Sequence, residues 1–118
     1  MSEHTEQCAL FEWAEAMQNK YPELQLMFAV PNGEYRHKST AARLKKAGVK
    51  AGVPDIILPV ARGAYISLAI ELKYGKNKPS EAQAWWIKRL REQGYAVGIF
   101  YSWEAARDAI IDYLGGKI

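Results

Sequence analysis

The sequence predicts an α/β fold in which helices flank a small mixed sheet of about four strands. Apolar residues recur at helical spacing near both ends of the chain and again around residue 86. Short β-branched runs lie between these segments, and glycine or proline separates the two kinds of segment. The predicted order is helix, strand, an optional short helix, strand, strand, helix, strand and helix.

Composition and length narrow the class of protein. Of the 118 residues, 49% are hydrophobic and 25% charged, which is typical of a globular chain rather than a disordered one, so we expect one domain over residues 1–118. The single cysteine excludes an intramolecular disulfide, and the polar amino terminus is unlike a secretory signal. No apolar run approaches the roughly 18 residues of a membrane span. We therefore expect a cytoplasmic protein without a membrane segment.

The first half of the chain contains a helix, a strand and a short basic helix. Residues 3–19 have one apolar face and are followed by the helix breaker Pro22. That face consists of Leu10, Trp13, Ala14 and Met17. The apolar run 24–30 predicts a strand, and residues 39–47 predict a basic helix that ends at Gly48.

A hairpin follows. The apolar runs 55–60 and 65–73 predict two strands, and Gly63 between them is the expected centre of the turn. Alternation places Glu71 and Lys73 on one face of the second strand. The other face is an apolar row that we expect to be buried: Ile66, Leu68, Ile70 and Leu72.

The last third of the chain predicts helix, strand and helix. The sequence from Ser80 to Gln83 matches a capping box, and Gly94 suits the end of the helix that this box begins. Trp86, Ile87 and Leu90 form its inner face, so the neighbouring Trp85 is expected to be exposed. Residues 95–101 predict a strand. Ser102 then caps a final helix that ends at residues 115–116, with Trp103, Ala106, Ile110 and Leu114 inward.

Three charged residues converge if the hairpin turns at Gly63. In an antiparallel pair centred there, Asp55 lies opposite Glu71, and opposite residues share a face with Lys73. Two facing carboxylates repel, and a divalent cation such as Mg²⁺ would compensate them. The alternative is a plain ion pair between Lys73 and Glu71 at a strand end, with no metal.

These residues resemble a known motif. The chain reads Gly52-Val53-Pro54-Asp55, then fifteen residues, then Glu71-Leu72-Lys73, which resembles the PD-(D/E)xK nuclease superfamily. Nearly the whole chain is similar to the VRR-NUC family of that superfamily, which occurs alone in bacteria and phages and at the carboxyl terminus of the Fanconi-associated nuclease. The further matching features are Glu6-Gln7 in the first helix, Pro31-Asn32-Gly33, Gly48, the Ser80–Gln83 segment, Gly94-Tyr95 and Tyr113-Leu114. The Val-Arg-Arg pattern that names the family is not visible as such, and this stretch reads Ala-Gly-Val-Lys-Ala-Gly.

The resemblance implies a restriction-endonuclease-like core and a set of site residues. Asp55 and Glu71 would bind Mg²⁺ or Mn²⁺, the Leu72 carbonyl would add a ligand, and Lys73 would assist the attacking water. The first-helix acid and the glutamine after the motif strand would complete the site. By match these are Glu6, with Glu3 as the competing acid, and Gln83, which has a second explanation as the capping-box partner of Ser80.

A basic stretch suggests how DNA would be held. The chain has a net charge of +3, and six basic residues against one acid lie between Pro31 and Pro54. The candidate phosphate contacts are Arg36, Lys38, Ser39, Arg43, Lys46 and Lys76. The alternative for this stretch is a solvated basic surface.

The expected function is a Mg²⁺- or Mn²⁺-dependent, structure-specific DNA endonuclease of a bacterial or phage-infected cell. No motif for reading bases is present, so branching and shape would select the substrate, and the resemblance favours four-way junctions and a homodimer. Trp85 is a candidate for the dimer contact. The alternative is a DNA-binding module on the same fold that does not catalyse a reaction.

Overall fold

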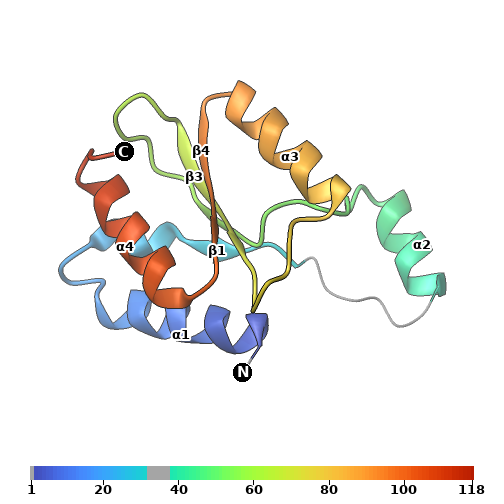
Figure 1. Cartoon of the computed structure of the whole chain (residues 1–118), viewed down its shortest axis with the longest axis horizontal. Helices are drawn as coiled ribbons and strands as arrows, with labels where there is room; N and C mark the ends of the chain where they lie inside the picture. Colours follow the sequence, from blue (N-terminus) through green and yellow to red (C-terminus); the bar gives the residue numbers. More distant parts are fainter. Residues whose placement is uncertain (1, 32–37) are drawn as a thin grey trace.

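The computed structural model describes residues 2–31 and 38–118. A four-stranded mixed sheet forms its centre, with helices on both faces (Figure 1). The strands are β1 (Phe28–Ala29), β2 (Ile56–Leu58), β3 (Ser67–Leu72) and β4 (Tyr95–Phe100), in the order β1-β2-β3-β4. The helices are α1 (Glu3–Ala16), α2 (Lys38–Lys46), α3 (Glu81–Glu92) and α4 (Trp103–Leu114), and η1 (Pro22–Leu26) is a 3-10 helix. The predicted α/β class and the four-strand mixed sheet are confirmed.

The strand pairing agrees with the expected hairpin. β2 and β3 are antiparallel, and their partners Ile56–Ile70, Ile57–Ala69 and Leu58–Leu68 are centred on Gly63, whose φ is +56°. β1 pairs antiparallel with β2, and β4 pairs parallel with β3 through the crossover helix α3. The register places Asp55, one residue before β2, opposite Glu71.

Strand alternation divides the core into two layers. On one face, α1 and α4 cover the larger cluster, which includes Leu10, Ile56, Leu68, Ile70 and Ile110. On the other face, α3 covers a smaller cluster built on Ala69, Ile87 and Val97. Glu71 has the same parity as Ala69 in β3, so its side chain lies in the layer of α3.

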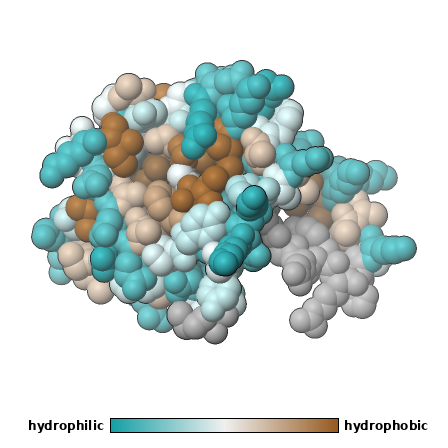
Figure 2. All heavy atoms as spheres, in the orientation of Figure 1, coloured by the Kyte–Doolittle hydropathy of each residue, from teal (hydrophilic) through white to brown (hydrophobic). Residues whose placement is uncertain are grey.

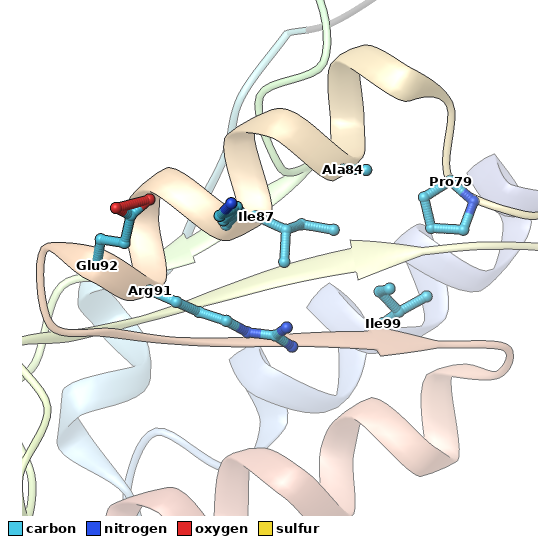
Figure 3. Close-up of a pocket in the computed structure, with 7 residues that line it drawn as sticks. Pro79, Ala84, Ile87, Arg91, Glu92 and Ile99 are labelled. Carbon is cyan, nitrogen blue, oxygen red and sulfur yellow. The ribbon is translucent and has the colours of Figure 1, made fainter.

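Helix α3 begins where the capping box predicts. The Ser80 hydroxyl accepts a hydrogen bond from the Gln83 amide, and the Gln83 side chain bonds back to the Ser80 amide. Figure 3 shows α3 above β4, with Ile87 and Ile99 facing each other and the Arg91 guanidinium extended toward the strand. Arg91 Nη2 donates to the Val97 carbonyl at 2.8 Å, which occupies a backbone acceptor of the edge strand.

The structure corrects several predicted boundaries. The strand expected over residues 24–30 is present but much shorter than predicted, because residues 22–26 form η1 and only Phe28–Ala29 pair as β1. Pro22 sets the φ angle for a helical turn, and Leu24 is buried from that turn, so its apolar character did not indicate a strand. The first helix ends at Ala16 rather than at residue 19.

Two further side chains differ from expectation. Ile66 precedes the first paired residue of β3 and is 56% exposed, so the buried apolar row begins at Leu68. Tyr113 was not among the predicted inward residues of α4. It is 1% exposed, and its hydroxyl donates to the Val60 carbonyl at 2.6 Å, which satisfies its polar atom inside the core. Within the described ranges, no helix is long and apolar enough to cross a membrane.

Candidate active site

Asp55 and Glu71 meet at the ends of β2 and β3. The Leu72 amide donates to Asp55 Oδ2 at 2.9 Å, which fixes the Asp55 carboxylate against the last residues of β3. Glu71, the second-last residue of β3, is an acid and yet is only 1% exposed. The predicted meeting of the two acids is therefore present in the structure, and it costs desolvation of both.

Gln83 joins the site to the start of α3. Its Nε2 donates to Glu71 Oε1 at 2.6 Å, while its Oε1 accepts from Lys73 Nζ at 2.7 Å and from the Ser80 amide at 2.8 Å. One amide thus caps the helix, as the capping box predicts, and also bridges the acid and the lysine. Few residue types can do this, since the bridge needs a donor and an acceptor on one planar group.

Lys73 is held rather than free. It is 7% exposed, and its ammonium lies 3.8 Å from Glu71 Oε1 as well as 2.7 Å from Gln83. The hydrogen bond to Gln83 is the shorter of these two contacts. Lys73 is therefore positioned mainly by the amide, with the Glu71 charge as a weaker partner.

The two carboxyl groups perturb each other. Burial, followed by the negative charge of Asp55, raises the pKa of Glu71 to about 8. Burial also raises the pKa of Asp55, against the lowering effect of the hydrogen bond from the Leu72 amide. Without a cation, the pair therefore retains a proton near neutral pH.

The donor set suits a hard divalent cation. Glu71 Oε2 is buried and has no hydrogen-bond partner, although buried carboxylate oxygens are normally paired. A cation at the pair would satisfy that oxygen and offset the repulsion between the two acids, and oxygen ligands are what Mg²⁺ and Mn²⁺ prefer. The described residues contain no cluster of three or more histidines, cysteines or acids that could hold a metal, so the protein's side chains offer a pair.

The two candidate acids of α1 differ in their surroundings. Glu6 is 7% exposed and lies on the face of α1 that carries Leu10 and Ala14, in the layer opposite α3. Glu3, one turn earlier, is the acid of α1 whose charge raises the pKa of Asp55. Neither acid forms a three-acid cluster with Asp55 and Glu71 in the part of the chain that the structure describes.

Gly52 contributes to the site without touching it, a role that the sequence analysis missed. Its φ is +91°, and a Cβ atom added to it would lie 2.7 Å from the carbonyl carbon of Ala82 and 2.9 Å from the Ala82 Cβ. The loop before Asp55 therefore packs directly on the backbone beside Gln83. Trp86 holds the same loop, because its Nε1 donates to the Ala51 carbonyl at 3.0 Å. The signal in the sequence that could have indicated this close approach was the glycine at position 52, two residues before Pro54.

Comparison with known proteins identifies the family of this chain. The family model described as "VRR-NUC domain" matches residues 3–103. The chain belongs to the VRR-NUC family. A solved structure titled "VRR_NUC domain protein" has 30% sequence identity and a TM-score of 0.83, and the match covers 98% of this chain and 89% of that one. No curated protein matches. The fold is the PD-(D/E)xK fold of this family, and a nuclease-type domain implies DNA as its substrate.

Within the described residues, the predicted phosphate contacts of this VRR-NUC domain lie on α2 and in the loop after β3. Figure 1 shows α2 standing away from the sheet, beside the beginning of α3. Lys38, Ser39, Arg43 and Lys46 are exposed on α2, which has no buried residue. Lys76 is exposed in the loop between β3 and α3. Arg36 lies outside the described residues, as do Asn32 and Gly33 of the family resemblance.

Proposed function

We propose that the protein is a Mg²⁺- or Mn²⁺-dependent endonuclease that hydrolyses phosphodiester bonds in DNA. The observation that supports this most directly is the Asp55–Glu71 pair, in which Glu71 is buried with one unpaired oxygen, set beside a lysine that an amide holds in place. A structural ion pair alone would not need a second carboxylate buried against the first.

In this proposal Asp55, Glu71 and the carbonyl of Leu72 hold the cation. When bound, it lowers the pKa of a water and stabilises negative charge on the phosphate. By the family resemblance, Glu6 is the acid of α1 that would complete the site, with Glu3, whose charge contributes to the raised pKa of Asp55, as the competing acid.

Lys73 and Gln83 have complementary roles. The Lys73 ammonium, at the end of β3, would orient the attacking water and stabilise the charge that develops on the phosphate. Gln83 keeps it there through the 2.7 Å hydrogen bond and restrains the Glu71 carboxylate through the 2.6 Å one. Both side chains are thus set before a substrate arrives, which lowers the cost of ordering them during the reaction.

Branched DNA, in particular a four-way junction, is the substrate that we propose. The exposed cations Lys38, Arg43, Lys46 and Lys76, with Ser39, would contact phosphates, which carry no base sequence, so selection would depend on shape. Resolving a junction needs paired nicks, and a two-fold dimer supplies two sites.

An apolar face beside β4, the edge strand of the sheet, supports the homodimer. Figure 2 shows hydrophobic side chains near the centre of the face where β4 runs between α3 and α4. A groove of about 560 Å³ lies there, lined in part by Pro79, Ala84, Ile87 and Ile99 (Figure 3). We propose that a second copy covers this face. Light scattering at micromolar concentration tests the dimer, and the mass of one chain would refute it.

Cleavage assays test the chemistry. Plasmid, linear duplex and four-way junction substrates are incubated with Mg²⁺, with Mn²⁺ and with EDTA. We expect products with either metal, none with EDTA, and faster cleavage of junctions than of linear duplex. Equal rates on junction and duplex would remove the junction preference but keep the nuclease.

The second candidate, a DNA-binding module without catalysis, is favoured only by the 3.8 Å contact between Lys73 and Glu71. It predicts DNA binding without products under all these conditions.

A further inference from the structure

A groove between α2 and α3 opens beside the acidic pair. It encloses about 820 Å³, and its walls include Lys45 and Lys50 on one side and Trp85 and Trp86 on the other. The proposed function does not use this combination of cations and aromatic rings. Such a combination is typical of surfaces that bind single-stranded nucleic acid, where bases stack on rings and lysines contact phosphates.

The two tryptophans of the groove have different roles. The indole of Trp86 is tied to the Ala51 carbonyl and is therefore part of the wall. Trp85 is 53% exposed, which is unusual for a side chain of this size unless the ring has a partner. The Trp85 ring meets Trp86 edge-on at 5.4 Å, and the Arg89 guanidinium lies 5.4 Å from its centre. The ring is thus held in one orientation, which lowers the entropy cost of stacking a base on it.

The charge of the opposite wall is one-sided. From Lys38 to Lys50 the chain carries five basic residues and no acid, and all five are exposed. α2 accordingly lies among the hydrophilic regions at the right of Figure 2. A polyanion is the ligand that such a wall favours, and an uncharged apolar peptide is not.

Gln83 connects the groove with the candidate active site. The same side chain lines the groove and bonds to both Glu71 and Lys73. A strand lying in the groove would therefore pass along Gln83, one hydrogen bond away from Glu71 and Lys73. A paired duplex offers no free base face to Trp85, whereas an unpaired strand does.

We propose that this groove binds single-stranded DNA, with a base stacked on Trp85 and the backbone on Lys45 and Lys50. The inference rests on the proposed function and widens its substrate, because a four-way junction is fully paired whereas this groove would take DNA that also carries an unpaired strand. The substrate class is accordingly DNA with an unpaired strand adjoining a duplex.

Binding in EDTA tests the proposal without any cleavage. The probe is a fluorescently labelled dT oligonucleotide of about 12 residues, measured by anisotropy against the wild type, Trp85→Ala and Trp85→Phe. We expect Trp85→Ala to weaken dT binding by about 5- to 150-fold, as loss of one stacked base implies, and Trp85→Phe to stay close to the wild type. Phe28→Ala is the control, because Phe28 is 48% exposed and does not line the groove.

The lysines are tested by salt dependence. Lys45→Ala with Lys50→Ala should flatten the log–log salt slope for dT by about 1.4 units, since each phosphate contact on a single strand contributes roughly 0.7. The control pair, Lys20→Ala with Lys117→Ala, removes the same charge at exposed positions outside the groove and should leave the slope unchanged.

Three results would overturn the proposal. One is that Trp85→Ala binds dT as tightly as the wild type. If that variant is also a monomer where the wild type is a dimer, the Trp85 ring belongs to a contact between two copies of the chain. Another is an equal loss for dT and for blunt duplex, and the third is wild-type affinity for an abasic oligomer equal to that for dT. Because binding is measured in EDTA, an inactive wild type that still binds dT through Trp85 would refute only the nuclease. Active cleavage without Trp85-dependent binding would refute only the groove.

Discussion

Gly52→Ala is the substitution that most directly tests how the loop before Asp55 positions α3. The new Cβ would lie 2.7–2.9 Å from backbone and Cβ atoms of Ala82, none of which can rotate away. The φ of +91° alone costs an alanine roughly 1–2 kcal/mol, and overpacking against fixed atoms adds about 1–3 kcal/mol. Gly48→Ala is the matched control, because its φ is +100° and no described atom lies within 4 Å of the added Cβ.

The measurement is thermal unfolding of both variants in EDTA, followed by cleavage with Mg²⁺. Both variants carry the cost of a positive φ, so their free energies of unfolding should differ by the overpacking cost alone, about 1–3 kcal/mol. This corresponds to a melting temperature roughly 4–12 °C lower for Gly52→Ala than for Gly48→Ala. Moving Ala82 also moves Gln83, whose bonds to Glu71 and Lys73 at 2.6 and 2.7 Å tolerate little displacement, so cleavage should fall in Gly52→Ala alone. Equal melting temperatures for the two variants would refute the argument that this contact sets the position of α3.

Three further predictions concern the site and its surroundings. Gln83→Ala should lower the free energy of unfolding by about 2–4 kcal/mol, whereas Ser80→Ala should lower it by about 1 kcal/mol, because only Gln83 also bonds to Glu71 and Lys73. Equal losses for the two variants in denaturant titrations would mean that Gln83 acts only as a helix cap. Glu71→Gln should abolish cleavage yet stabilise the metal-free protein. Because the pKa of Glu71 is raised from 4.5 to about 8 in the folded protein, the stability contributed by protonated Glu71 is complete below pH 4.5 and is lost as the pH rises through about 8. The melting temperature of Glu71→Gln should therefore depend less on pH over this range than that of the wild type. An equal pH dependence of the two melting temperatures would contradict the assignment. Arg43→Ala with Lys46→Ala should weaken duplex binding uniformly across sequences and flatten the salt slope by roughly one unit for each lost phosphate contact; an unchanged slope would leave α2 a solvated basic surface.

Local rules account for the parts of the fold that the sequence predicted well. The meeting of Asp55 and Glu71 followed from one turn glycine and the two-residue period of strands, and the observed pairs of β2 and β3 are centred on that glycine. The start of α3 followed from the capping box. Each of these is a relation between neighbours in the chain or across one hairpin, so the residue types involved specify it.

Other features depend on packing between elements and were missed for that reason. Leu24 is buried either from a strand or from a 3-10 turn, and an apolar run does not distinguish the two. Ile66 continues the two-residue alternation of the buried Leu68, Ile70 and Leu72, but it lies before the first residue of β3 and is exposed.

The sequence by itself determined that an acid, a second acid and a lysine share one face of a hairpin, because spacing along strands fixes which side chains meet there. Only the tertiary structure decided that Gln83 bridges Glu71 to Lys73, that Gly52 must lack a side chain beside Ala82, and that Trp85 faces a basic groove. Those features join α3 to the loop before β2 and to the end of β3, and they set α3 across a groove from α2. Their distances follow from how the layers pack, a property of the whole fold that no local pattern encodes.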